Sequence, residues 1–123
     1  MEKMGAPQLF ELFLHTLDCC GMFLLRCDAQ DIEYYLFEEF DTDSISFLHE
    51  NTLNILLEND YISPDAYSLS KLLNERFRKM EGTNFWDPGS VKDRLEWHAI
   101  LELADKIKSI VRGNAYSIKT CED

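Results

Sequence analysis

Apolar residues recur every three or four positions along most of this chain, and this spacing constrains the fold more than any other feature. The first series spans residues 7–26 and consists of Leu9, Phe13, Leu17, Cys20 and Leu24. Such spacing places the side chains on one face of an α-helix. The chain also has only five glycines and three prolines, which disfavours an all-β fold with many tight turns. The sequence therefore predicts an all-α protein.

Capping residues and breaks divide the rest of the chain into further predicted helices. Residues 28–40, which Asp28 would cap, fit a second helix, although "EYYLF" also suits a strand and leaves this choice open. The stretch "DTDSIS" at 41–46 prefers caps and turns, so we expect a break there. A third helix then begins at Ser44 or Ser46 and ends near Asn59.

Two longer helices complete the prediction. Ser63 caps the fourth helix, Pro64 occupies its first position, and Gly82 ends it. The last helix begins at Asp87 or Ser90 and runs to about Arg112. We expect one domain, 1–112, built as an antiparallel helical bundle of about five helices, with the third and fourth forming an αα-hairpin. Residues 113–123 lack periodicity and are expected to form a loosely ordered tail.

Negative charge is concentrated in one third of the chain. The net charge is −11, and residues 27–70 contain eleven acidic and no basic residues, while the flanking parts are nearly balanced. This charge argues against nucleic acid and anionic membranes as partners. The apolar run from Leu9 to Leu25 is short and interrupted by charged residues, and no export signal is evident. We therefore expect a cytoplasmic protein with reduced cysteines. The oligomeric state stays open.

No combination of residues predicts catalysis, a cofactor or a metal. His15 and Cys19 have the spacing of two zinc ligands, but a zinc site needs at least one more protein ligand. His98, Glu102 and Asp105 form a row on the last helix without a nucleophile or a phosphate-binding loop. We expect no enzyme, and the roles of His15, His49 and His98 stay open. Trp86 is expected to close one end of the bundle.

The acidic stretch is the best candidate for a functional surface. It combines carboxylates, which attract a cationic partner, with tyrosines, which supply rigid contact area. Near the end of the second predicted helix these residues would project as a cluster. The predicted partner-binding residues are Tyr34, Tyr35, Glu38, Glu39, Asp41 and Asp43. A surface that serves only solubility usually mixes both signs of charge, and this one does not. We therefore expect the stretch to bind a partner, and its negative charge predicts that the partner is a basic protein.

In size, charge and texture the chain resembles the bacterial immunity proteins. The resemblance covers roughly residues 8–112 and includes "ENDYISPDAYSLSKLLNERF" and "VKDRLEWHAILELADKI". It implies tight stoichiometric binding of one cognate toxin, often a nuclease with a basic cleft. Because the resemblance rests on no invariant motif, it assigns no functional residue.

Two other functions stay open on the sequence. A regulatory or adaptor subunit of a larger complex would show a broad exposed apolar patch and a weak dependence of binding on salt. A metal-dependent enzyme or sensor would use His15, Cys19 and a cysteine from elsewhere in the chain.

Overall fold

The computed structural model describes residues 5–112, and every regular element in that range is helical. The predicted all-α fold is confirmed, and residues 28–40 are helical rather than a strand. The predicted tail, 113–123, lies outside the described residues. The elements are α1 (Ala6–Asp18), the 3₁₀-helix η1 (Met22–Arg26), α2 (Ala29–Ile32), the π-helix η2 (Glu33–Phe40), α3 (Asp41–Phe47), α4 (Glu50–Glu58), α5 (Pro64–Met80), α6 (Pro88–Asp93) and α7 (Leu95–Arg112).

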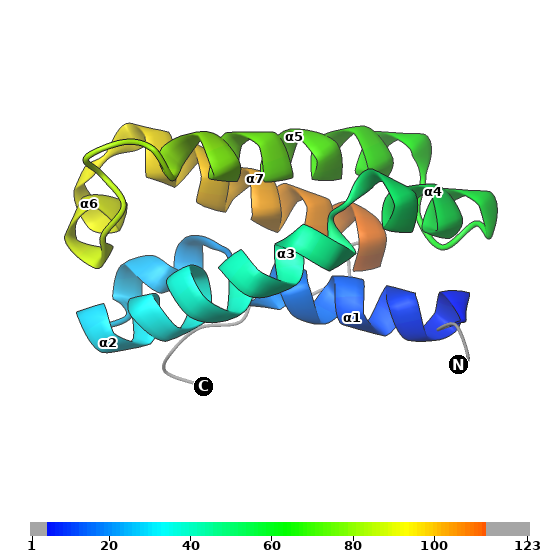
Figure 1. The fold of residues 1–123 in the computed structure, drawn as a ribbon, viewed down its shortest axis with the longest axis horizontal. Coiled ribbons are helices and arrows are strands. Elements are labelled where there is room, and N and C mark those ends of the chain that lie inside the picture. Colours follow the sequence, from blue (N-terminus) through cyan, green and yellow to red (C-terminus); the bar gives the residue numbers. More distant parts are fainter. Residues whose placement is uncertain (1–4, 113–123) are drawn as a thin grey trace.

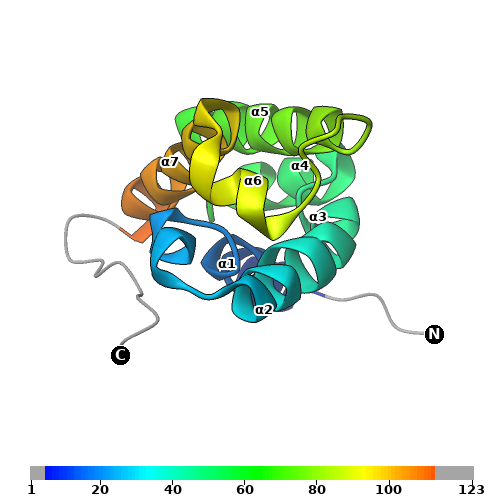
Figure 2. The same ribbon diagram turned by 90° about the vertical axis from the view of Figure 1, so that its left-hand side faces the viewer.

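The helices form two layers (Figure 1). The antiparallel helices α5 and α7 make one layer, and α1 with the antiparallel segment α2–η2–α3 makes the other. The view along the bundle shows α6 closing one end, and α4 packs against both α1 and α5 (Figure 2). The antiparallel bundle is as predicted, and α4 and α5 form the expected hairpin.

Aromatic rings fill the space between the layers near α6. Phe37 of η2 lies 4.9 Å from Trp86 between ring centroids, and Trp86 lies 5.1 Å from Phe77 of α5. Trp97 of α7 is fully buried among these rings, 5.6 Å from Phe37 and 5.9 Å from Phe77. Trp86 therefore closes the end of the bundle, as expected.

Residues 41–46 are helical, so the predicted break is wrong. The chain continues as helix from η2 directly into α3, and α4 begins only after His49, whose Nδ1 accepts from the Asn51 amide at 3.0 Å. Asp41 and Ser44 prefer turns when their side chains bond to the local backbone. Here both side chains bond Arg78 of α5, and the Ser44 hydroxyl also donates to the Asp41 carbonyl oxygen within the helix, so these contacts are compatible with a helix at this position.

The first and last predicted helices are each divided in two. The first ends at Asp18, and Gly21 follows in a turn where a Cβ atom would lie 2.5 Å from Asp105 Oδ1 and 2.8 Å from Lys108 Nζ. The last is broken by the extended backbone of Arg94, between α6 and α7. The predicted start of the fourth helix is confirmed, since Ser63 caps α5 by accepting from the Ala66 amide.

Candidate functional site

The segment α2–η2–α3 places a line of carboxylates on its outward side. Its inner side buries Ile32, Leu36, Phe37 and Phe40, which fixes the segment against the bundle. We call the outward residues the acidic surface; they are Tyr34 with the carboxylates of Asp28, Asp31, Glu33, Glu38, Glu39 and Asp43. The buried side thus determines which carboxylates face the solvent or a partner.

The π-helical turns of η2 bring together side chains five residues apart. The Tyr34 hydroxyl donates to Glu39 Oε1 at 2.9 Å, across an interval of five residues. A π-helix aligns residues i and i+5, whereas an α-helix aligns i with i+3 and i+4. This hydrogen bond raises the pKa of Tyr34, and the negative charge of Glu39 raises it further. Segments of π-helix occur frequently at functional sites.

The carboxylates of the acidic surface lack cationic partners within the described part of the chain. No ion pair joins any of the six to a lysine, arginine or histidine among residues 5–112. Asp28 accepts from the Asp31 amide and so caps α2, but that bond leaves its charge in place. Because like charges on one surface repel each other, this surface is electrostatically suited to a cationic partner.

Asp43 is a partly buried carboxylate of the acidic surface whose pKa is shifted. Its pKa is raised above 3.8, first by partial burial and second by the neighbouring Glu39 carboxylate, while His15 of α1 acts in the opposite direction. The negative charge of Asp43 therefore lowers the stability of the free protein. Residues that lower stability in this way are often found at functional sites. A partner's cation placed between Glu39 and Asp43 would relieve this repulsion.

We expect Asp43→Asn to raise the free energy of unfolding at pH 7. Because the pKa of folded Asp43 lies above the unfolded value of 3.8, the cost of its charge is present above the folded pKa. That cost is absent below the unfolded value, where Asp43 is protonated in both states. Urea denaturation at pH 7 and at about pH 3 should show the gain shrinking at acid pH. A variant less stable than the wild type at pH 7 would contradict this account.

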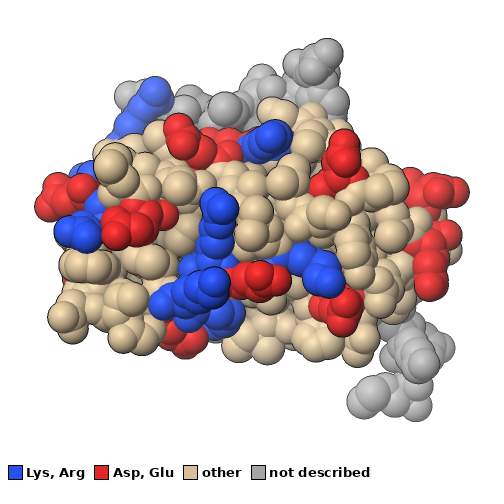
Figure 3. Space-filling view, turned by 90° about the horizontal axis from the view of Figure 1, so that it is seen from above, with Lys and Arg blue, Asp and Glu red and all other residues tan. Residues whose placement is uncertain are grey.

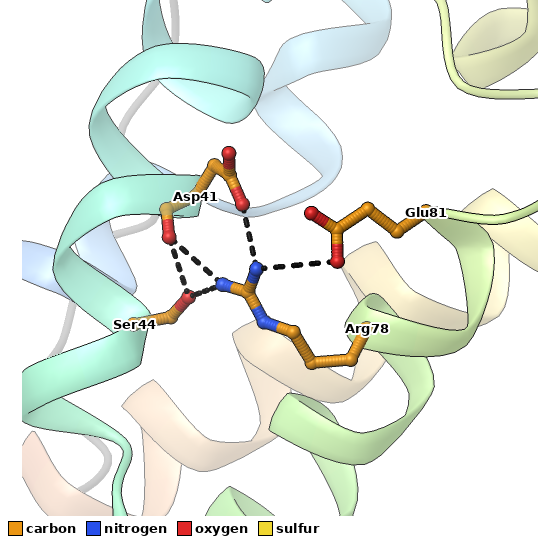
Figure 4. A network of polar contacts seen from close by, with 4 residues as sticks. All are labelled: Asp41, Ser44, Arg78 and Glu81. Atoms are coloured by element: carbon orange, nitrogen blue, oxygen red, sulfur yellow. Dashed lines mark hydrogen bonds and ion pairs between the residues drawn. The ribbon is translucent and has the colours of Figure 1, made fainter.

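Asp41 differs from its neighbours because it is used within the fold. Arg78 Nη1 lies 2.7 Å from Asp41 Oδ1, and Arg78 Nη2 donates to the Asp41 carbonyl oxygen at 2.8 Å and to Ser44 Oγ (Figure 4). Glu81 approaches the same guanidinium at 3.7 Å. Asp41 therefore points toward α5 rather than projecting with Glu38 and Glu39. Its carboxylate Oδ1 is already paired with Arg78, so Asp41 is less suited to a partner than Glu38 and Glu39 are.

The two adjacent tyrosines also have different surroundings. Tyr34 is 49% exposed, whereas Tyr35 packs edge-on against Phe23 of η1 at 5.7 Å between ring centroids. Tyr34 is thus the better placed of the two to contact a partner. Tyr35 instead connects the acidic surface to the core.

The other candidate sites do not assemble in the described residues. His15 is exposed while Cys19 is buried, and no group of three potential metal ligands forms within residues 5–112. The predicted row of His98, Glu102 and Asp105 on α7 does not share one surface, since Glu102 is exposed and Asp105 faces the interior. His98 Nε2 lies 2.8 Å from the Lys92 carbonyl oxygen, which stabilises the junction of α6 and α7.

The cysteines only partly match the expectation of reduced thiols. Cys19 and Cys20 are buried and form no disulfide, and burial raises the pKa of Cys20 to about 12, so the Cys20 thiol is unreactive at neutral pH. Cys27, however, is disulfide-bonded. A cytoplasmic location stays a prediction, and this bond counts against it because disulfides are rare in reducing compartments.

The stretch Ala6–Arg26 is long and apolar enough to cross a membrane, by length and composition alone. An 18-residue window of it has a mean hydropathy of 1.3, which differs from the expectation that the interrupted apolar run is too short to span a bilayer. Half of that window is buried within the bundle, as in the core helix of a folded domain.

Sequence reasoning missed a buried ion pair on α7. Lys108 is fully buried, lies 3.1 Å from Asp105 Oδ1 and donates to the Cys20 carbonyl oxygen at 2.8 Å. The Met22 amide donates to Asp105 Oδ2 at 3.1 Å. The pair holds the turn between α1 and η1. Its signal was present in the sequence, because Lys108 follows the inward-facing Ala104 by four residues.

Comparison with protein families, with curated proteins and with solved structures found no match to this chain.

Proposed function

We propose that this chain is a protein-binding inhibitor that neutralises a basic partner through its acidic surface. The observation that carries the proposal is that the six carboxylates of the acidic surface form no ion pair within residues 5–112. They lie beside Tyr34, whose side chain is about half exposed. The expected partner is a cationic toxin, as for the immunity proteins that the chain resembles. No catalytic step is required of this chain.

Charge and shape support complementary parts of the proposal. The carboxylates would attract a basic protein over distances of about 10 Å at moderate salt, which speeds association. Tyr34 would then supply a rigid ring for close contact, and Ile45 of α3, 59% exposed, would supply apolar area. Both apolar groups lie on the same continuous helical segment as the carboxylates.

Inhibition would follow from occupation of the partner's positive surface. Proteins that act on nucleic acid bind phosphates through clusters of lysine and arginine. A carboxylate surface that pairs with those cations excludes the phosphates from them. The expected result is one inhibitor bound to one toxin.

Reversing three charges of the acidic surface should abolish binding while the fold is kept. In the variant Glu38→Lys/Glu39→Lys/Asp43→Lys we expect affinity to fall at least about a hundredfold, because like-charge contacts cost several kcal/mol. Asp41 is left unchanged because its pair with Arg78 stabilises the fold. The measurement is recovery of a basic partner by tagged wild type and variant.

A matched control has the same change in net charge at other positions. Glu11, Glu58 and Glu102 are exposed on α1, α4 and α7, so Glu11→Lys/Glu58→Lys/Glu102→Lys should bind as the wild type does. Circular dichroism would show that both variants stay helical. Equal binding by the two variants would refute the assignment of the acidic surface.

A further inference from the structure

A shallow groove lies between α5 and α7, in the layer that does not contain the acidic surface. Its volume is about 290 Å³, and its lining consists of Arg76, Lys79, Met80, Glu96, Ala99 and Ile100. Seen from this side, lysine and arginine side chains gather over α5 in the middle of the molecule (Figure 3). Acidic side chains lie among them, and the groove itself is lined by two cations and one carboxylate.

The size and floor of the groove suit an apolar side chain of a partner. Sites for small molecules usually enclose about 300–1,000 Å³, so this groove is at the lower limit and accommodates one or two side chains. Met80, Ala99 and Ile100 form its apolar floor. A groove between two helices is also a common binding site for a third helix.

Leu95 extends the apolar area beyond the groove. It is 79% exposed, because the extended backbone of Arg94 begins α7 with this residue facing outward. Leu95 precedes Ala99 by four residues, so both lie on the same face of α7. A partner that extends from the groove along this face of α7 would therefore gain apolar contact with Leu95.

Two cations on α5 border this surface and form no ion pair with any residue between positions 5 and 112. Lys71 pairs with Glu50 and Arg78 pairs with Asp41, but Arg76 and Lys79 form no ion pair within the described residues. The carboxylate of Glu96 also lines the groove, but it is paired with Arg94, whose Nη2 lies 3.3 Å away, and so does not neutralise Arg76 and Lys79. Arg76 and Lys79 are three residues apart, where like charges repel, so carboxylates from a partner would stabilise them.

We propose that the groove between α5 and α7 binds an acidic helical segment of a second protein. One apolar side chain of that segment would pack against Met80, Ala99 and Ile100, and its carboxylates would pair with Arg76 and Lys79. This site is independent of the acidic surface, and with it one chain would contact two partners of opposite charge.

The test is a titration of the ¹⁵N-labelled full chain, followed by nuclear magnetic resonance. The first probe is an amphipathic peptide of about 15 residues, long enough for four helical turns, with leucines on one face and glutamates on the other. The second peptide has lysine in place of every glutamate, and the third probe is a single-stranded DNA oligonucleotide. We expect only the acidic peptide to shift the amide signals of Leu95, Ala99 and Ile100.

Variants of this chain test the positive charges of the groove and its shape separately. Arg76→Glu/Lys79→Glu should weaken binding of the acidic peptide at least tenfold, and Ala99→Trp, which fills the groove, should weaken it similarly. Lys92→Glu/Lys106→Glu makes the same change in net charge at two exposed positions outside the groove and should leave affinity unchanged.

Three results would overturn the proposal. They are the absence of shifts at these residues with acidic peptide up to about 1 mM, an unchanged affinity in Arg76→Glu/Lys79→Glu, and binding of the oligonucleotide here in place of the peptide. None of them bears on the acidic surface, whose test uses a different partner and different residues.

Discussion

Replacing Lys108 by methionine should lower the free energy of unfolding by about 3–5 kcal/mol. Methionine has a similar length, so the main loss is electrostatic. Asp105, only 9% exposed, would keep its charge without the ammonium group now 3.1 Å away. The Cys20 carbonyl oxygen would also lose its donor, and the turn at Gly21 would lose one of the two side chains that hold it. Urea denaturation followed by circular dichroism measures the change.

Two controls distinguish the buried pair from its surroundings. Lys106→Met, two residues earlier and exposed, should change stability by no more than about 0.5 kcal/mol. In Asp105→Asn/Lys108→Met the loss should be clearly smaller than the sum of the two single losses, because the residues interact directly. A loss below about 1 kcal/mol in Lys108→Met would mean that Asp105 does not depend on this partner.

Trp97→Ala should also cost about 3–5 kcal/mol, the range for truncating a large buried aromatic residue. Trp97 is fully buried and packs against Phe37, Phe77 and Trp86, with ring centroids 5.6 Å, 5.9 Å and 5.9 Å away. Its Nε1 donates to the Phe85 carbonyl oxygen at 2.7 Å. Truncation would leave a cavity where η2, α5 and α7 meet. Thermal unfolding followed by circular dichroism measures this loss.

Trp97→Phe divides that loss into packing and hydrogen bonding. The smaller ring keeps most of the aromatic contacts but lacks the N–H group, so we expect a cost of about 1–2 kcal/mol. Leu95→Ala, on the same helix but 79% exposed, should be close to neutral. If Trp97→Phe were as harmful as Trp97→Ala, ring packing would not be the main contribution.

The aromatic cluster also connects the core to the acidic surface. Phe37 and Phe40 anchor the inner side of η2, and Phe40 packs edge-on against Phe77 at 4.7 Å between centroids. The outward side of the same turns carries Tyr34, Glu38 and Glu39. A loss of packing at Trp97 should therefore disturb the acidic surface as well as the bundle.

Helix caps and apolar spacing, which act within one or two helical turns, correctly predicted the helices that they determine. Ser63 and Pro64 mark the start of α5 because a cap and an N-terminal proline act within one helical turn. The apolar spacing of Leu9, Phe13 and Leu17 similarly identified α1. Where a distant residue decides the outcome, local signals failed. Asp41 and Ser44 are typical of turns, but in the structure they lie in a helix that contacts Arg78, far along the chain.

The candidate site was predictable in its charge and less so in its geometry. The concentration of carboxylates between Asp28 and Asp43 is visible in the sequence. The π-helical turns that align Tyr34 with Glu39 are not, because no sequence signal separates them from α-helix. The inward direction of Tyr35 and Asp41 depends on Phe23 and Arg78, which lie on other elements.

The central claim is that the acidic surface binds one basic partner by charge. The most direct test is a pull-down with the tagged chain from lysate of the source organism at about 50 mM and about 500 mM salt, with mass spectrometry of the bound proteins. We predict one basic protein, recovered in equimolar amount at low salt and much less at high salt. Several partners held equally at both salts, or no basic partner at low salt, would contradict the claim.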